Sequence, residues 1–221
     1  MRRAVYALIA GILLSASLVG QQQPGPQGAT EAQVKSAQIE VPRLVTLLEL
    51  RPGMTVADVG AGFGAWTVVL AKWIGPSGRV YASDIGAQQL QILREAVQRE
   101  RLTNVTILEG AERSTNLPAG CCDAVLIRDA YHHLTQPMDI TRSFAASLKP
   151  GGRLAVIDFP TRPNTEVPAG VPANRGGHGV PPEIVVKEVT AAGLTHVRTD
   201  ANWSPDSQPA MLFIALFRKP A

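Results

Sequence analysis

The chain has 221 residues, and 45% of them are hydrophobic, as expected for a globular protein with a sizeable buried core. Lys and Arg exceed Asp and Glu by 21 to 18, which gives a formal net charge of +3. We expect the segment that carries Arg2 and Arg3 to be removed, which leaves about +1. So small a charge, with no Lys/Arg-rich run, argues against nucleic acid and other polyanions as partners.

Residues 1–20 have the layout of a secretory signal peptide. Arg2 and Arg3 precede an uncharged stretch from Ala4 to Val19, and small residues cluster near its end. The stretch is short for a membrane span, which needs about 20 apolar residues. An uncleaved anchor formed by residues 4–19 is the alternative. In either case the leading positive charges favour export of the rest of the chain, to the periplasm or the outside.

Residues 21–29 are rich in Gln, Pro and Gly and are predicted to form a flexible linker. The folded domain is therefore expected to cover residues 30–221. A helical pattern opens it between Thr30 and Leu50, and Pro42 within that pattern is expected to split it into two helices.

A glycine-rich stretch follows the first predicted strand, which starts at Thr55 and leads to Asp58. The glycines, Gly60, Gly62 and Gly64, precede a helix predicted over 65–74. Such a strand, turn and helix typically bind a nucleotide cofactor, because glycine lets the backbone approach a ligand and the helix offers free N–H groups. The spacing also fits the dinucleotide fingerprint. A carboxylate at Asp58, however, suits a ligand with an amino group and a sulfonium.

A second strand, predicted over 79–83, ends at Asp84. A carboxylate at that tip can hold a ribose diol, although it can also cap the helix predicted over 86–101. The loop after a third strand (104–108) carries Ala111 and Glu112 and would border an adenine.

The fourth and fifth strands are predicted over 123–128 and 153–158, on either side of a helix over 137–148. Five strands that alternate with helices predict a parallel, doubly wound sheet. Ligands bind such sheets at the carboxyl ends of the strands. The acidic residues at those ends are Asp58, Asp84, Glu109, Asp129 and Asp158.

Residues 159–180 hold four prolines in a long irregular segment, which we expect to act as a lid over the cleft. A helix over 181–192 and two strands over 194–199 and 211–218 complete the pattern.

The two cysteines, Cys121 and Cys122, are adjacent. Neighbouring cysteines rarely reach disulfide geometry, so we expect both to be unpaired, buried and apolar in character. Their spacing does not indicate a structural zinc site.

Four stretches carry a resemblance: VADVGAGFG (56–64), YASDI (81–85), DAVLIRDAYHHL (123–134) and LKPGGRLAVIDF (148–159). Over roughly residues 34–218 the chain resembles the class I methyltransferases that depend on S-adenosylmethionine (SAM). The resemblance implies a Rossmann-like α/β fold: a doubly wound, seven-stranded, mostly parallel sheet with its last strand antiparallel. It also implies an enzyme that moves a methyl group from SAM to a small molecule by in-line displacement.

The resemblance assigns roles to individual residues. Asp58 and the backbone of Gly60, Ala61, Gly62 and Gly64 would hold the methionyl part of SAM. Asp84 would bind the ribose, and Ile85 would pack on the adenine. Many members carry Asp at the position of Ala111, so Glu109 or Glu112 would replace that contact. The remaining residues assigned to cofactor binding are Ala111, Glu112 and Arg128.

A hydroxyl or protonated amine acceptor needs a base. The candidates are His132 and His133, with Asp129 to orient one of them, and His178 on the lid; Tyr131 would shape the acceptor pocket. Helix capping or packing is the alternative role for the His pair. We assign no metal, although Asp129 and the three histidines could surround one.

Two other functions stay open at this point. One is an NAD(P)-dependent oxidoreductase, against which Asp58 and the terminal strand pair argue. The other is a non-catalytic binding module on a degenerate methyltransferase fold, against which the intact Asp58, glycines and Asp84 argue.

Overall fold

The computed structural model describes residues 28–203 and 212–221. The predicted signal peptide, most of the predicted linker and the first residue of the predicted last strand lie outside these ranges. The strands are β1 (Thr55–Val59), β2 (Arg79–Asp84), β3 (Val105–Glu109), β4 (Cys122–Arg128), β5 (Leu148–Asp158), β6 (Thr195–Asp200) and β7 (Phe213–Arg218). The α-helices are α1 (Glu31–Leu47), α2 (Ala65–Ile74), α3 (Ala87–Arg99), α4 (Pro137–Ser147) and α5 (Pro182–Ala191), and the short 3-10 helices are η1 (Tyr131–His133) and η2 (Ala173–Arg175).

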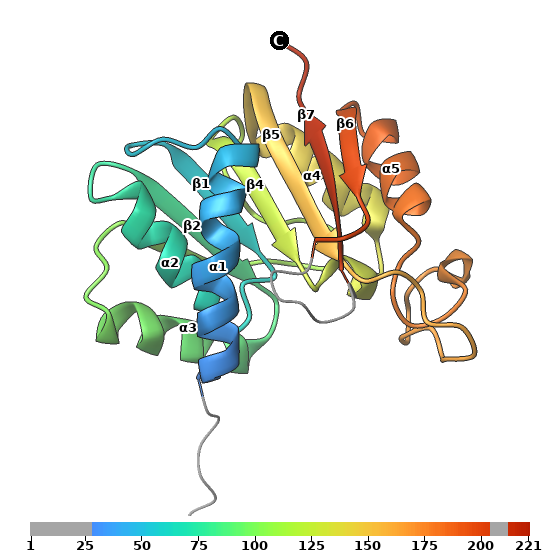
Figure 1. Ribbon diagram of the computed structural model, residues 1–221, viewed down its shortest axis with the longest axis horizontal. Helices are drawn as coiled ribbons and strands as arrows, with labels where there is room; N and C mark the ends of the chain where they lie inside the picture. Colours follow the sequence, from blue (N-terminus) through green and yellow to red (C-terminus); the bar gives the residue numbers. More distant parts are fainter. Residues whose placement is uncertain (1–27, 204–211) are drawn as a thin grey trace, which may run out of the picture.

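The seven strands form one sheet in the order β3-β2-β1-β4-β5-β7-β6 (Figure 1). Neighbouring strands from β3 to β5 pair in parallel, whereas β7 is antiparallel to both β5 and β6. The predicted fold class is therefore confirmed. The order of the strands reverses between β1 and β4, and at such a point the loops diverge and leave a crevice at the carboxyl ends.

Both faces of the sheet are covered by helices, which explains why the central strands are apolar throughout. On one face, Val56 and Leu126 pack with residues of α1 and α2. On the other face, Ala57 and Val125 pack with residues of α4 and α5. Figure 1 shows α1 in front of the sheet and α4 behind it. The period-2 alternation of side chains thus places neighbouring residues of one strand in two separate cores.

The first helix is continuous, contrary to the predicted split at Pro42. Helix α1 runs from Glu31 to Leu47 with Pro42 inside it, and a reciprocal capping box between Thr30 and Gln33 fixes its start. Proline removes one helical hydrogen bond and disfavours a helix interior by roughly 3 kcal/mol. Fully buried Val41 and Leu44 lie next to it, so packing against the sheet outweighs that local penalty.

The cysteine prediction is wrong in one respect, because a disulfide joins Cys121 to Cys122. Cys121 lies just before β4 and Cys122 is its first residue, with a register irregularity between Cys122 and Ala124. The regular alternation that would point the two side chains to opposite faces therefore does not apply. The predicted burial is correct for Cys122, which is fully buried in the core.

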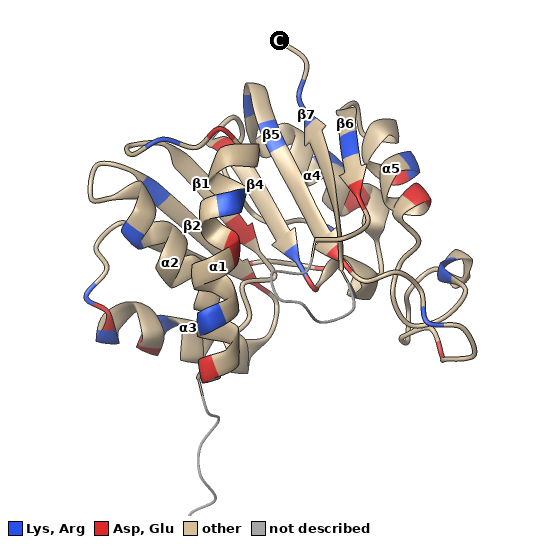
Figure 2. Cartoon of the chain, in the orientation of Figure 1, with Lys and Arg blue, Asp and Glu red and all other residues tan. Residues whose placement is uncertain are grey.

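Charged residues of both signs are interspersed over the drawn ribbon (Figure 2). Across the described parts of the chain, no helix is long and apolar enough to cross a membrane.

A buried ion pair attaches α1 to the carboxyl end of β4. Both oxygens of the fully buried Glu40 accept hydrogen bonds from Arg128, at 2.8 and 3.0 Å, and Trp66 Nε1 donates to the same carboxylate at 2.9 Å. The guanidinium lies over the Trp66 ring, 3.9 Å from its centroid. Loss of Arg128 would leave Glu40 unpaired in a dry environment, and loss of Glu40 would leave a largely buried guanidinium without its counter-charge.

We therefore expect Glu40→Ala to lower the free energy of unfolding by up to about 3–5 kcal/mol, because Arg128, whose side chain is only 15% exposed, would keep an uncompensated charge. The measurement is urea unfolding followed by circular dichroism. Glu49→Ala is the matched control, since it removes an exposed Glu that pairs with Arg153 and should cost less than about 1 kcal/mol. Equal losses in the two variants would contradict this account.

Candidate active site

Two cavities open side by side at the carboxyl ends of the central strands. The loop cavity, of about 420 Å³, is lined by the glycine turn after β1, the tip of β2 and the loop after β3. The histidine cavity, of about 480 Å³, is lined by Arg128 at the end of β4, by residues that follow β4 and β5, and by Leu212 just before β7. Asp129 and His133 line both cavities, so the two spaces share a wall at these residues.

The glycine turn is shaped for close approach to a ligand. Gly60 has a φ of +69°, and a Cβ there would lie only 2.6 Å from the Cβ of Ala130. Gly62 has a φ of +53° and no atom within 4 Å of such a Cβ, so its side-chain position opens into space. Gly64 precedes α2 without a side-chain cap, and the first turn of that helix does not line the loop cavity. Of the predicted turn residues, Gly60 and Gly62 line the loop cavity, whereas Ala61 and Gly64 do not.

Asp84 fixes the glycine turn but does not cap α3, whose N-cap is Gly86 and which has no side-chain cap. One carboxylate oxygen accepts a hydrogen bond from the backbone N–H of Gly62 at 2.9 Å, and the other accepts from Gly86 N–H at 3.0 Å. The side chain therefore ties β2 to the glycine turn while it lines the loop cavity. Ile85 lines the same cavity and is 64% exposed, so it offers the cavity an apolar surface that a flat apolar ligand would cover.

Asp58 lies beneath the turn, without lining the cavity itself. Its carboxylate is almost fully buried and accepts a 2.6 Å hydrogen bond from the Thr67 hydroxyl. Burial, reinforced by the nearby charge of Asp84, raises the pKa of Asp58 from 3.8 to about 6. A cation bound above the turn would favour the ionised form of this carboxylate.

The loop after β3 supplies Ala111 and Glu112 to the cavity wall, whereas Glu109 does not line it. Several small polar residues of this wall were missed: Ser83, Gln89, Ser114, Thr115 and Thr135. Of these residues, Ser83 could most easily have been predicted, because it directly precedes Asp84 at the end of β2.

Two predicted site residues do not lie where the sequence analysis placed them, because other side chains bind them. Arg128 does not line the loop cavity; it lines the histidine cavity while Glu40 holds its guanidinium. Tyr131 lines neither cavity, because its ring is fully buried and its hydroxyl donates to Glu188 at 2.8 Å. Glu188 also pairs with the fully buried Arg175 of η2, at 2.9 Å. Tyr131 therefore helps to hold the 159–180 segment instead of shaping the acceptor pocket.

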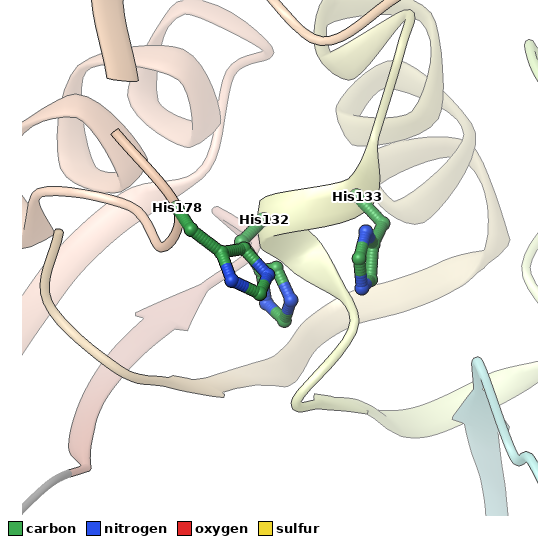
Figure 3. A group of neighbouring side chains, drawn as sticks. All are labelled: His132, His133 and His178. Atoms are coloured by element: carbon green, nitrogen blue, oxygen red, sulfur yellow. The ribbon is translucent and has the colours of Figure 1, made fainter. Parts of the chain in front are cut away.

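The three candidate histidines meet at the histidine cavity (Figure 3). His132 and His133 come from η1, and His178 comes from the segment after β5. The ring centroids of His132 and His133 are 4.0 Å apart, and those of His132 and His178 are 5.0 Å apart. The 159–180 segment thus supplies one wall of this cavity, together with Phe159 and Arg162.

The carboxylate that orients a histidine is Asp158 and not Asp129. Asp158 is fully buried at the end of β5, and its two oxygens lie 2.8 Å from His132 Nδ1 and 3.0 Å from the His132 backbone nitrogen. Asp129 has a φ of +53° and lines the cavities, where burial and the charge of Asp158 raise its pKa. The sequence predicts Asp158 at a strand end, but it does not show that His132 is its partner.

His133 is the exposed member of the cluster and lies on the wall between the two cavities. Burial, with smaller contributions from His132 and His178, lowers its pKa below the usual value of 6.5. His133 is therefore neutral near pH 7 and able to accept a proton.

Comparisons with known proteins agree with this geometry. Residues 56–152 match the family model described as a methyltransferase domain. A curated demethylmenaquinone methyltransferase from Listeria welshimeri is 33% identical over 118 residues, which make up 53% of this chain and 50% of that protein. The chain thus spans about half the length of the curated relatives it matches.

Solved structures extend the similarity to most of the chain. A SAM-dependent methyltransferase from Aquifex aeolicus superposes with a TM-score of 0.62 at 24% identity, covering 84% of this chain and 97% of that one. Phosphoethanolamine N-methyltransferase 2 from Haemonchus contortus, solved with phosphomonomethylethanolamine and S-adenosylhomocysteine, gives a TM-score of 0.67 at 14% identity, covering 83% and 53%. These likenesses show the Rossmann-like methyltransferase fold.

The raised pKa of the buried Asp58 should make the stability of the protein depend on pH. Because its folded pKa of about 6 exceeds the reference value of 3.8, the native state binds more protons than the unfolded state between these values. The contribution of Asp58 to stability therefore falls as pH rises through this window. Asp58→Asn, which keeps an acceptor for Thr67, removes this loss, so the variant should gain on the order of 3 kcal/mol relative to the parent across the window.

Urea unfolding of both proteins at intervals from about pH 4 to about pH 7.5 measures this difference. Asp200→Asn, on β6 at the edge of the sheet, serves as the control and should show no such trend. If the free energies of unfolding of the parent and of Asp58→Asn differed by the same amount at every pH measured, Asp58 would already be ionised in the native state over the whole range.

Proposed function

We propose that this protein is a SAM-dependent methyltransferase that transfers a methyl group to a small-molecule acceptor. The observation that carries the proposal is the shared wall between the two cavities. A cofactor in the loop cavity and an acceptor in the histidine cavity would meet at Asp129 and His133. The family match and the fold of the structural neighbours support the same activity.

The residues of the loop cavity fit the cofactor. Gly60 and Gly62 form a cradle without side chains, which allows close approach of the methionyl part. Asp84 is held by backbone N–H groups with lone pairs left for a ribose diol. Exposed Ile85 offers an apolar surface to the adenine. When bound, SAM supplies an activated methyl group.

The chain then contributes alignment, exclusion of water and a base. Neutral His133 takes the proton of a hydroxyl or amine acceptor at one of its ring nitrogens, and Phe159 and Arg162 border the space that the acceptor enters. The relatives named as demethylmenaquinone methyltransferases support a small organic molecule as acceptor.

The topology disfavours the oxidoreductase alternative, since β7 inserts antiparallel between β5 and β6. The binding-module alternative shares the fold, and only an assay of methyl transfer separates it from the enzyme.

The proposal includes export of the domain, either released or anchored by residues 4–19. It rests on Arg2, Arg3 and the uncharged stretch directly after them in the sequence. Exported SAM-dependent chemistry would require the cofactor to be loaded before export or supplied outside the cytoplasm.

Cofactor binding is the first test. Calorimetry with SAM, S-adenosylhomocysteine and NAD should show binding of the two sulfur nucleotides and none of NAD. Asp84→Asn should weaken the binding of S-adenosylhomocysteine roughly 10- to 100-fold, as expected for the loss of hydrogen bonds to a charged acceptor. Asp200→Asn, an identical change on β6, should leave the affinity unchanged. Binding of NAD alone, or of none of the three, would overturn the assignment.

Export is tested separately in a bacterium with two membranes. Mass spectrometry of the periplasmic protein should show a chain that lacks roughly the first 20 residues, as expected for signal peptides. Leu13→Arg interrupts the apolar stretch and should keep the intact chain in the cytoplasm. If the parent protein is found in the cytoplasm with Met1–Gly20 intact, the export proposal fails.

A further inference from the structure

The histidine cluster has features that proton transfer alone does not require. A single base would suffice for a hydroxyl or amine acceptor, yet the structure gathers three of the chain's four histidines at one point. One imidazole nitrogen from each of His132, His133 and His178 lies within 4.8 Å of the others. Figure 3 shows the rings side by side, contributed by two segments that are distant in the sequence.

We propose that His132, His133 and His178 bind a divalent transition-metal ion of the zinc class. While the ion is bound, His133 serves as a ligand and not as the base described above, so the two roles belong to different states of the site. Imidazole is a preferred ligand of zinc, copper, iron and nickel. Three protein ligands with a fourth position open to water or substrate form the arrangement of catalytic zinc sites, whereas structural sites use four protein ligands.

The second coordination sphere is already in place around His132. Asp158 holds Nδ1 of His132 at 2.8 Å and also fixes the backbone of that residue, which leaves Nε2 as the free ligand atom. A carboxylate that holds the second nitrogen is the usual companion of a metal-binding histidine, because it fixes the tautomer and raises the basicity of the ligand. Asp158 is fully buried, so its position is set by the core and not by solvent.

An unsatisfied polar atom points to the same ligand. Nε2 of His178 is buried and has no hydrogen-bond partner among the described residues. A buried polar nitrogen without a partner is costly, and in native structures such atoms usually indicate a missing partner such as a water or an ion. Coordination to a metal would satisfy it without a change of the fold.

The charges around the cluster suit a cation. Asp129 and Asp158 form a second group with His132 whose ligand atoms also lie within 4.8 Å of one another. Arg128 lines the cavity, but Glu40 neutralises it, whereas Arg162 lies over the Phe159 ring. The two carboxylates, against the single guanidinium of Arg162, therefore leave a net negative surrounding that favours a divalent cation.

To bind the ion, the three ligand nitrogens must move slightly closer together. Zinc–nitrogen bonds of about 2.0–2.1 Å in a tetrahedral site place the ligand nitrogens about 3.3 Å apart. His133 is exposed and His178 lines the histidine cavity, so both rings border open space in which they can turn toward His132. The open position of the ion would face the histidine cavity, beside the wall shared with the loop cavity.

Metal binding can be measured without cofactor or acceptor, so its outcome does not depend on methyl transfer. The full chain is stripped with a chelator and titrated with Zn²⁺ in a calorimeter, and Co²⁺ is used as a spectroscopic probe of coordination. We expect one ion per chain and the intense visible absorption of four-coordinate Co²⁺. His133→Gln and His178→Gln should each weaken Zn²⁺ binding about 100-fold or more, and Asp158→Asn about 10- to 100-fold.

His196→Gln is the matched control. His196 is the fourth histidine of the chain and lies on β6, where its Nε2 contacts the Thr199 hydroxyl at 2.9 Å. This variant should bind Zn²⁺ as the parent does. Circular dichroism of each variant checks that the fold is kept. Failure of the parent to take up one ion per chain would overturn the proposal, as would uptake that survives both His133→Gln and His178→Gln.

Discussion

The reversal of strand order between β1 and β4 is the constraint on which the rest of the structure depends. From β1 the chain proceeds outward to β2 and β3 and then crosses to β4 and β5 on the other side. The loops that leave β1 and β4 therefore diverge, and the space between them cannot be filled by either loop. Because helices cover both faces of the sheet, this edge is where backbone N–H groups and acidic side chains can stay in contact with a ligand.

Buried ionic contacts hold the segments that surround this edge. Glu40 fixes Arg128 and with it the end of β4, while Glu188 joins Arg175 of the 159–180 segment to Tyr131. Asp158 does the same for His132. Buried charges are costly unless they are paired in good geometry, so each contact allows few alternative arrangements. The long segment after β5 thus reaches the cavity with a defined course despite its lack of regular structure.

The elements that the sequence predicted well are those encoded by short apolar runs with clear boundaries. Helix α2 has its predicted bounds, because Gly64 and Gly75 enclose it, and β4 begins one residue earlier than expected. The two errors in local structure have different causes. Pro42 lies inside a continuous helix and Cys121 pairs with its neighbour, although local rules disfavour both. At these positions burial against the sheet, or the irregular start of a strand, decided the outcome.

The sequence by itself determined the class of fold and the edge of the sheet at which the site lies. Strand periodicity, glycine turns and acidic residues at strand ends are each encoded within a few neighbouring residues. Only the tertiary structure decided which side chains meet. Arg128 pairs with Glu40 across 88 positions, Tyr131 with Glu188 across 57, and His132 with Asp158 across 26. Such pairs depend on how helices and strands pack in three dimensions, and a short sequence pattern does not encode that packing.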